Sequence, residues 1–134
     1  MNVNDFIEIK FASPIKGRGA FAKQFIKEGI TIEKAPIIII NDRELKQIED
    51  SVVFNYTFHW NPPSVPPKTR FAIAMSPCEF INHSFEPNMA YAYDYDKETI
   101  EFYTIKDIQP GEELSINYNG DPEDKTPMWF ETEE

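Results

Sequence analysis

Three short segments carry residue types at spacings that could do chemistry. In the first, residues 16–21 (KGRGAF), Gly17 and Gly19 flank a single residue. Because glycine has no Cβ, the backbone there can turn sharply and come close to a ligand, and its exposed peptide groups could bind a carboxylate or an amine. The same residues also suit an ordinary hairpin turn, which is the better interpretation of this segment taken alone.

The second segment is an irregular polar loop, residues 80–88 (FINHSFEPN), which follows an apolar stretch. Such a loop needs side chains to satisfy its backbone polar groups. Asn82 offers two donors and an acceptor, and His83 can bridge two partners. The loop therefore fits a ligand site and, equally well, a structural loop held by a buried histidine.

The third segment, residues 111–118 (GEELSINY), is a turn followed by a strand that ends at Tyr118. A tyrosine at the end of a strand is usually a packing residue, although its hydroxyl can also donate and accept hydrogen bonds. Taken one at a time, the three segments do not separate a chemical role from a structural one.

In their order and separation, the three segments resemble the motifs of the SET domain family. The shared patterns are GRGxFA, FINHSxxPN and GEELxxxY, and the aromatic stretch YTFHW at residues 56–60 also resembles a strand of many SET domains. The resemblance covers about residues 6–120. It implies a protein-lysine N-methyltransferase that moves a methyl group from S-adenosylmethionine (SAM) to a lysine side chain and releases S-adenosylhomocysteine.

The resemblance also implies roles for particular residues. Tyr118 would lie beside the transferring methyl group, and Tyr91 would line the channel for the lysine. The residues expected to bind the cofactor are Lys16, Gly17, Arg18, Gly19, Tyr56, Asn82, His83 and Trp129. Trp129 would stack on the adenine ring; the alternative is that it anchors the tail by packing on the domain.

Methyl transfer to an amine suits this set of residues. A free lysine, with a pKa of about 10.4, has to lose a proton before it attacks. Aromatic channel walls favour the uncharged amine by desolvation. A phenol hydroxyl and backbone carbonyls can orient the reacting groups. Tyr118 then need not be the base, because solvent can take the proton.

The elements that must position these residues are short. Eleven prolines and five glycines interrupt the chain and argue against a helical bundle. Apolar and β-branched patterns predict strands over residues 6–11, 20–22, 30–34, 37–40, 52–60, 89–95, 99–104 and 113–118, and a helix over 42–49. We expect Pro36 to end the strand before it and residues 61–68 to form a loop, and residues 71–81 fit more than one structure.

The expected fold is therefore mostly β, with several short sheets and one or two short helices. The SET resemblance adds a knot-like threading of the C-terminal segment beneath the loop at residues 82–88. It divides the chain into a SET domain, residues 1–120, and an acidic tail, residues 121–134, that closes the cofactor and substrate site. The single cysteine, Cys78, excludes an internal disulfide and a cysteine-built zinc site, and no metal is expected.

The net charge of −10 bears on the partners. So acidic a surface repels phosphate backbones, which argues against direct nucleic-acid binding, and attracts a basic, lysine-containing protein. Acidity that serves only solubility is the alternative. The chain shows neither a membrane-length apolar stretch nor a signal-peptide pattern, so we expect an intracellular protein, cytoplasmic or, in a eukaryote, nuclear. A homodimer also fits so small a domain.

The sequence leaves two functions open. The first is a SAM-dependent lysine methyltransferase that acts on a basic protein. The alternative is a catalytically inactive SET-like module that binds SAM, a basic partner protein or both. Many relatives carry a tyrosine in the strand that corresponds to residues 32–36, and this chain has none there, so the number of methyl groups added stays open.

Overall fold

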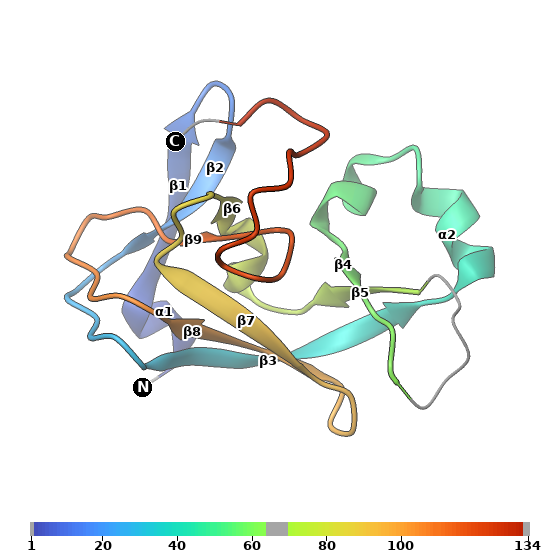
Figure 1. The fold of residues 1–134 in the computed structure, drawn as a ribbon, viewed down its shortest axis with the longest axis horizontal. Helices are drawn as coiled ribbons and strands as arrows, with labels where there is room; N and C mark the ends of the chain where they lie inside the picture. The colour runs from blue at the N-terminus through green and yellow to red at the C-terminus, as the bar shows by residue number, and fades with distance from the viewer. Residues whose placement is uncertain (1, 64–69, 133–134) are drawn as a thin grey trace.

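The computed structural model describes residues 2–63 and 70–132, which form three β-sheets with few helices (Figure 1). The strands are β1 (Ile7–Ser13), β2 (Gly17–Ala22), β3 (Thr31–Ile40), β4 (Phe58–His59), β5 (Phe71–Ala74), β6 (Asn82–His83), β7 (Met89–Asp94), β8 (Thr99–Thr104) and β9 (Ser115–Ile116). The helices are α1 (Val3–Phe6), α2 (Asp42–Ile48) and the 3-10 helices η1 (Val52–Tyr56) and η2 (Pro77–Phe80). The expectation of a mostly β fold is confirmed.

The largest sheet has the strand order β4-β5-β3-β8-β7, with β3 at its centre. The expectation that Pro36 ends a strand is wrong, because β3 continues through it. Up to Pro36 the strand pairs with β8, and from Ile37 onward it pairs with β5. Pro36 thus lies where the strand changes partner, a position at which the missing N–H of proline is tolerated.

Residues 52–60, expected as one strand, form η1 followed by the two-residue β4. A β-branched and aromatic composition indicates a strand only where the side chains meet a half-buried pleated surface. Here Val52 and Val53 are exposed, and only the last residues of the segment pair, with β5. Phe54 packs edge-on against Phe71, with 5.3 Å between ring centroids, which holds η1 against the sheet.

Several other predicted elements are confirmed. β7 and β8 form the expected hairpin, and α2 begins at a reciprocal cap between Asn41 and Glu44. Residues 71–81 resolve into β5 and η2. The last strand is shorter than expected, because Leu114 bonds instead to β2. Of the predicted loop over 61–68, residues 64–68 lie outside the described part of the chain.

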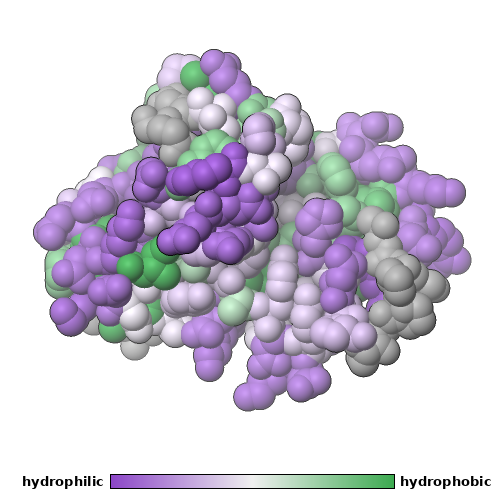
Figure 2. All heavy atoms as spheres, viewed as in Figure 1, coloured by the Kyte–Doolittle hydropathy of each residue, from purple (hydrophilic) through white to green (hydrophobic). Residues whose placement is uncertain are grey.

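One hydrophobic core joins the three sheets. Ile7 and Ala20 enter it from the β1–β2 hairpin, Phe102 from β8 and Ile116 from β9. Hydrophilic residues cover most of the face shown in Figure 2, in keeping with the net charge of −10. None of the helices described is long and apolar enough to cross a bilayer.

Candidate active site

The short parallel pair of β6 and β9 brings two remote motifs together. Asn82 lies opposite Ser115, and His83 lies opposite Ile116. Asn88 reinforces the pair: its Nδ2 donates to the Glu113 carbonyl at 2.9 Å, and its Oδ1 accepts from the Ser115 N–H at 2.9 Å. The loop at residues 82–88 is thereby fixed to the segment that leads to Tyr118.

Glu113 joins the glycine turn to this pair. Its Oε1 forms an ion pair with Lys16 Nζ at 2.9 Å, and its Oε2 accepts from Asn82 Nδ2 at 2.9 Å. Asn82 Nδ2 also donates to the carbonyl of Arg18 at 3.1 Å. Charge-assisted hydrogen bonds of this kind are stronger than neutral ones. The GEEL pattern contains Glu113, but nothing in the sequence marks it as a site residue.

The two glycines of the turn are needed for different reasons. Gly17 adopts a φ of +73°, in the left-handed region that favours glycine. Gly19 is limited by space: a Cβ there would lie 2.6 Å from Glu113 Oε2 and 2.8 Å from Asn82 Nδ2. A side chain at Gly19 would therefore break the contacts that hold Asn82.

Tyr118 is held at both ends. Its backbone N–H donates to His83 Nδ1 at 3.1 Å, and its hydroxyl donates to the carbonyl of Ile81 at 2.9 Å. Burial raises the pKa of Tyr118 above its usual value, and the nearby Glu79 carboxyl adds to the increase. The phenol therefore stays protonated at neutral pH, and its hydroxyl donates to the Ile81 carbonyl.

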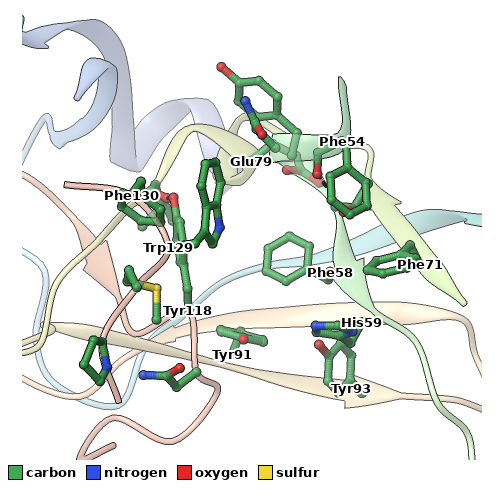
Figure 3. Close-up of a pocket in the computed structure, with 17 residues that line it drawn as sticks. Phe54, Phe58, His59, Phe71, Glu79, Tyr91, Tyr93, Tyr118, Trp129 and Phe130 are labelled. Carbon is green, nitrogen blue, oxygen red and sulfur yellow. Dashed lines mark hydrogen bonds between the residues drawn. The ribbon is translucent and has the colours of Figure 1, made fainter. Parts of the chain in front are cut away.

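Two cavities meet at Tyr118. The larger one, about 480 Å³, is called the aromatic cavity here (Figure 3). Its residues include Phe54, Phe58, Phe71, Glu79, Tyr91, Tyr93 and Met128. The smaller one, about 250 Å³, is called the asparagine cavity. Its residues include Ile15, Lys16, Asn82 and His83. Both cavities share Asn55, Tyr56, Tyr118, Trp129 and Phe130.

Most of the site residues expected from the sequence lie at these cavities. The asparagine cavity holds five of the eight residues expected to bind the cofactor: Lys16, Tyr56, Asn82, His83 and Trp129. Tyr91 lines the aromatic cavity. The remaining three, Gly17, Arg18 and Gly19, are not among the residues that line either cavity in the described part of the chain. The guanidinium of Arg18 lies instead over the Phe80 ring, 4.7 Å from its centroid.

The tail reaches the cavities through Trp129 and Phe130. Phe130 packs against His83 and Tyr118, with 6.1 Å and 6.0 Å between ring centroids. Trp129 is 79% exposed, with its ring 5.1 Å from Phe130. Phe130 is therefore the residue that packs the tail on the domain, and Trp129 is left accessible at the wall of both cavities. Phe130 was not predicted as a site residue from the sequence.

Asparagine side chains hold the tail in this position. Asn117 Nδ2 donates to the Asp124 carbonyl at 2.6 Å, and Asn119 Nδ2 donates to the Thr126 carbonyl at 3.0 Å. Lys125 Nζ donates to the Phe85 carbonyl at 2.6 Å. In Figure 1 the tail, drawn in red, runs from β9 toward the β1–β2 hairpin.

Edge-on and tilted aromatic rings form much of the aromatic cavity. Tyr91 packs edge-on against Phe58 at 5.2 Å and against Tyr93 at 5.8 Å between centroids. Burial raises the pKa of both tyrosines above the usual value. Such a wall gives little solvation to a charge inside it. No group of three or more His, Cys, Asp and Glu side chains converges as a metal site within residues 2–63 and 70–132.

Comparisons with known proteins agree on a single family. Residues 17–119 match the model of the SET domain. A histone-lysine N-methyltransferase of Schizosaccharomyces pombe, specific for H3 lysine-37, is 32% identical over 119 residues, 88% of this chain and 73% of that protein. The crystal structure of a Plasmodium falciparum candidate histone methyltransferase matches with a TM-score of 0.61 at 22% identity, over 85% of this chain and 93% of that one. This last likeness concerns the fold alone.

Proposed function

The chain belongs to the SET domain family, and on this premise we propose that it is a SAM-dependent protein-lysine N-methyltransferase. One observation carries the proposal: Tyr118 lies on the wall shared by the asparagine cavity and the aromatic cavity. Such a wall suits a reaction in which a donor on one side meets an amine on the other. The S. pombe relative, a histone-lysine N-methyltransferase by name, supports the same reaction.

The asparagine cavity offers groups that suit SAM. Lys16 offers a cation for the carboxylate of the methionine part, and Asn82 offers an amide. The aromatic rings of Trp129 and Tyr56 suit the adenine and the positive sulfonium. When bound, SAM supplies a methyl group on a cationic sulfur, and S-adenosylhomocysteine remains after transfer. Gly17, Arg18 and Gly19 would contribute through the backbone that Asn82 and Glu113 fix.

The aromatic cavity would receive the target lysine. Tyr91 and Tyr93 favour its uncharged form, because they exclude water and provide no compensating charge. The hydroxyl of Tyr118 and the carbonyl of Ile81, bonded to each other, form a polar point on this wall that can orient an amine. The tail, residues 121–134, would close the site, with Trp129 stacked on the cofactor.

We infer a basic, lysine-containing protein such as a histone as the substrate class. The net charge of −10 is complementary to such a protein, and attraction between opposite charges speeds encounter. A substrate of this kind would place the enzyme inside the cell, in the cytoplasm or the nucleus. Direct nucleic-acid binding is not part of the proposal.

The test is incubation of the protein with SAM labelled in the methyl group and a panel of basic proteins that includes histone H3, followed by mass spectrometry of modified lysines. We expect methyl-lysine on at least one of these proteins. SAM binding by calorimetry with no label on any of them would support the inactive module instead. Absence of SAM binding would refute the methyltransferase and leave only a module that binds a basic partner protein.

A further inference from the structure

Glu79 is the only acidic side chain among the described residues that line the aromatic cavity. It belongs to η2, directly before the loop that carries Asn82, and Figure 3 labels it with Tyr118 and Trp129 around this cavity. No lysine or arginine lines the cavity within the described part of the chain. The cavity therefore combines aromatic walls with a single carboxyl and lacks a permanent cation.

The backbone around Glu79 fixes the position of its carboxyl. The Ala74 N–H donates to Glu79 Oε1 at 2.6 Å, which ties the side chain to the end of β5. η2 itself is capped by Ser76, whose hydroxyl accepts from the Cys78 N–H at 3.0 Å. This Ala74 contact is the only hydrogen bond of the carboxyl among the residues described, and Glu79 is one of the residues that line the aromatic cavity.

The titratable groups near Glu79 come from several elements. Those that share its cavity are Tyr56 from η1, His59 from β4, Tyr91 and Tyr93 from β7, and Tyr118 from the segment after β9. On its own helix, the Cys78 thiol is buried, with a pKa raised to about 12. Of the strands packed on η2, β5 has no ionisable side chain. The strands β1 and β2, which also pack on η2, each carry one basic side chain. Lys10 of β1 lies over the Phe21 ring, and Arg18 of β2 lies over the Phe80 ring.

We propose that Glu79 binds the ε-ammonium of the target lysine and accepts one of its protons. This role rests on the proposed function and adds a proton acceptor to it. An N–H bond of the ammonium breaks, its electron pair stays on nitrogen, and the proton passes to the Glu79 carboxylate. The products are a neutral amine and a neutral carboxylic acid, which later releases the proton to solvent.

Two physical features support this step. In an aromatic cavity, a neutral amine beside a neutral acid is favoured over a poorly solvated ion pair. Burial also raises the pKa of Glu79 to about 8, and a proton acceptor works best when its pKa lies near the working pH. The amine would be released facing the polar point formed by Tyr118 and Ile81.

The Glu79→Gln variant separates this role from a structural one, because the amide oxygen of glutamine can still accept from the Ala74 N–H. In the wild type we expect kcat/KM to rise with pH and level off above about 8, where Glu79 is ionised. In the variant the plateau should be lost, and kcat/KM should keep rising toward the lysine pKa of about 10.4. At pH 8 the variant should be on the order of 100-fold slower. Glu49→Gln, which removes an exposed charge of the same kind, serves as the control.

A measurement without turnover tests the same proposal. The side-chain carboxyl carbon of Glu79, assigned by its loss in Glu79→Gln, is titrated by NMR with and without n-butylammonium chloride as a lysine mimic. The mimic should raise the pH at which Glu79 titrates relative to the same concentration of sodium chloride, because the proton that it delivers keeps the carboxyl neutral. An unmoved titration, or identical pH profiles for wild type and variant, would overturn the proposal. A wild type that binds the mimic at Glu79 but methylates no protein would refute the proposed function instead.

Discussion

At the scale of single residues, Tyr118 combines a fixed position with an unreactive phenol. Its hydroxyl donates a hydrogen bond to the Ile81 carbonyl, and its backbone N–H donates one to His83 Nδ1. In Tyr118→Phe the ring stays, so the walls of both cavities keep their shape. The polar point is lost, and we expect kcat to fall by about 100-fold or more while SAM affinity stays within a few fold. Single-turnover kinetics and calorimetry measure the two effects, and unchanged kcat would remove Tyr118 from the reaction.

The raised pKa of Glu79 also predicts how stability depends on pH. In the unfolded chain this carboxyl ionises near 4.5, whereas in the folded protein it stays protonated up to about 8. Between these values the folded state binds the extra proton, so the contribution of Glu79 to stability falls as the pH rises from about 4.5 to 8. Glutamine cannot ionise. The stability of the wild type relative to Glu79→Gln should therefore decrease by about 2–4 kcal/mol between pH 5 and pH 8.

Urea denaturation of both proteins at several pH values measures this difference. Other ionisable groups affect both proteins alike, so the comparison isolates Glu79. A difference that stays constant from pH 5 to pH 8 would show that the carboxyl titrates at an ordinary pKa and would also weaken its role as a proton acceptor.

Glu113 gives a further prediction at this scale. Glu113→Ala would free Lys16 Nζ and Asn82 Nδ2 from their positions at the asparagine cavity. We expect SAM affinity to fall about tenfold, equivalent to about 1.4 kcal/mol. The neighbouring Glu112, whose only described side-chain bond is to the backbone of Gln109, provides the control Glu112→Ala. Equal SAM affinities in the two variants would contradict the role given to Glu113.

Motifs identified the residues that the family shares but not the partners that position them. Asn82, His83 and Tyr118 stand in recognisable patterns, and the structure brings them to one cavity. Glu113 is recognisable as a site residue only through its contacts with Asn82 and with Lys16, which lies 97 positions away in the chain. In the same way, Glu79 can be recognised as a site residue only once it is known which side of η2 faces the aromatic cavity. Contacts between remote segments are set by tertiary packing, which one sequence does not reveal.

At the scale of elements, the β6–β9 pair is short, and side chains support it. Asn88→Ala would remove one donor and one acceptor that hold the Glu113–Ser115 backbone. Leaving those backbone groups unpaired should lower the free energy of unfolding by about 2 kcal/mol. Asn4→Ala, at an exposed position in α1, should change it by less than about 0.5 kcal/mol. Similar stabilities for the two variants would show that the pair does not need Asn88.

Local patterns predicted some elements well and others poorly. The hairpin of β7 and β8 and the cap of α2 depend on neighbouring residues, and both are confirmed. The prediction of a strand over residues 52–60 was wrong because no strand within residues 2–63 and 70–132 pairs with its first half. The prediction that Pro36 ends a strand was wrong because partner strands are present on both sides of it: β3 pairs with β8 up to Pro36 and with β5 after it. In both cases the outcome depends on what lies next to the segment in space.

At the scale of the whole molecule, the net charge of −10 predicts salt-sensitive encounter with a basic substrate. For an intact histone, kcat/KM should fall several fold as sodium chloride rises from about 50 to 500 mM, with kcat nearly unchanged. A short peptide with one lysine and no other charge should be much less sensitive. Equal salt dependence for protein and peptide would exclude the acidic surface from substrate binding.

Two further expectations at this scale, the homodimer and the knot-like threading of the C-terminal segment, remain predictions.

The central claim is that donor and amine meet at Tyr118 from two cavities. A crystal structure of the protein with S-adenosylhomocysteine and a lysine peptide from a methylated protein tests it most directly. We predict the nucleoside product in the asparagine cavity beside Asn82 and Trp129, and the lysine in the aromatic cavity between Tyr91 and Glu79, with sulfur and amine both close to Tyr118. The product bound elsewhere, or both molecules in one cavity, would contradict the account.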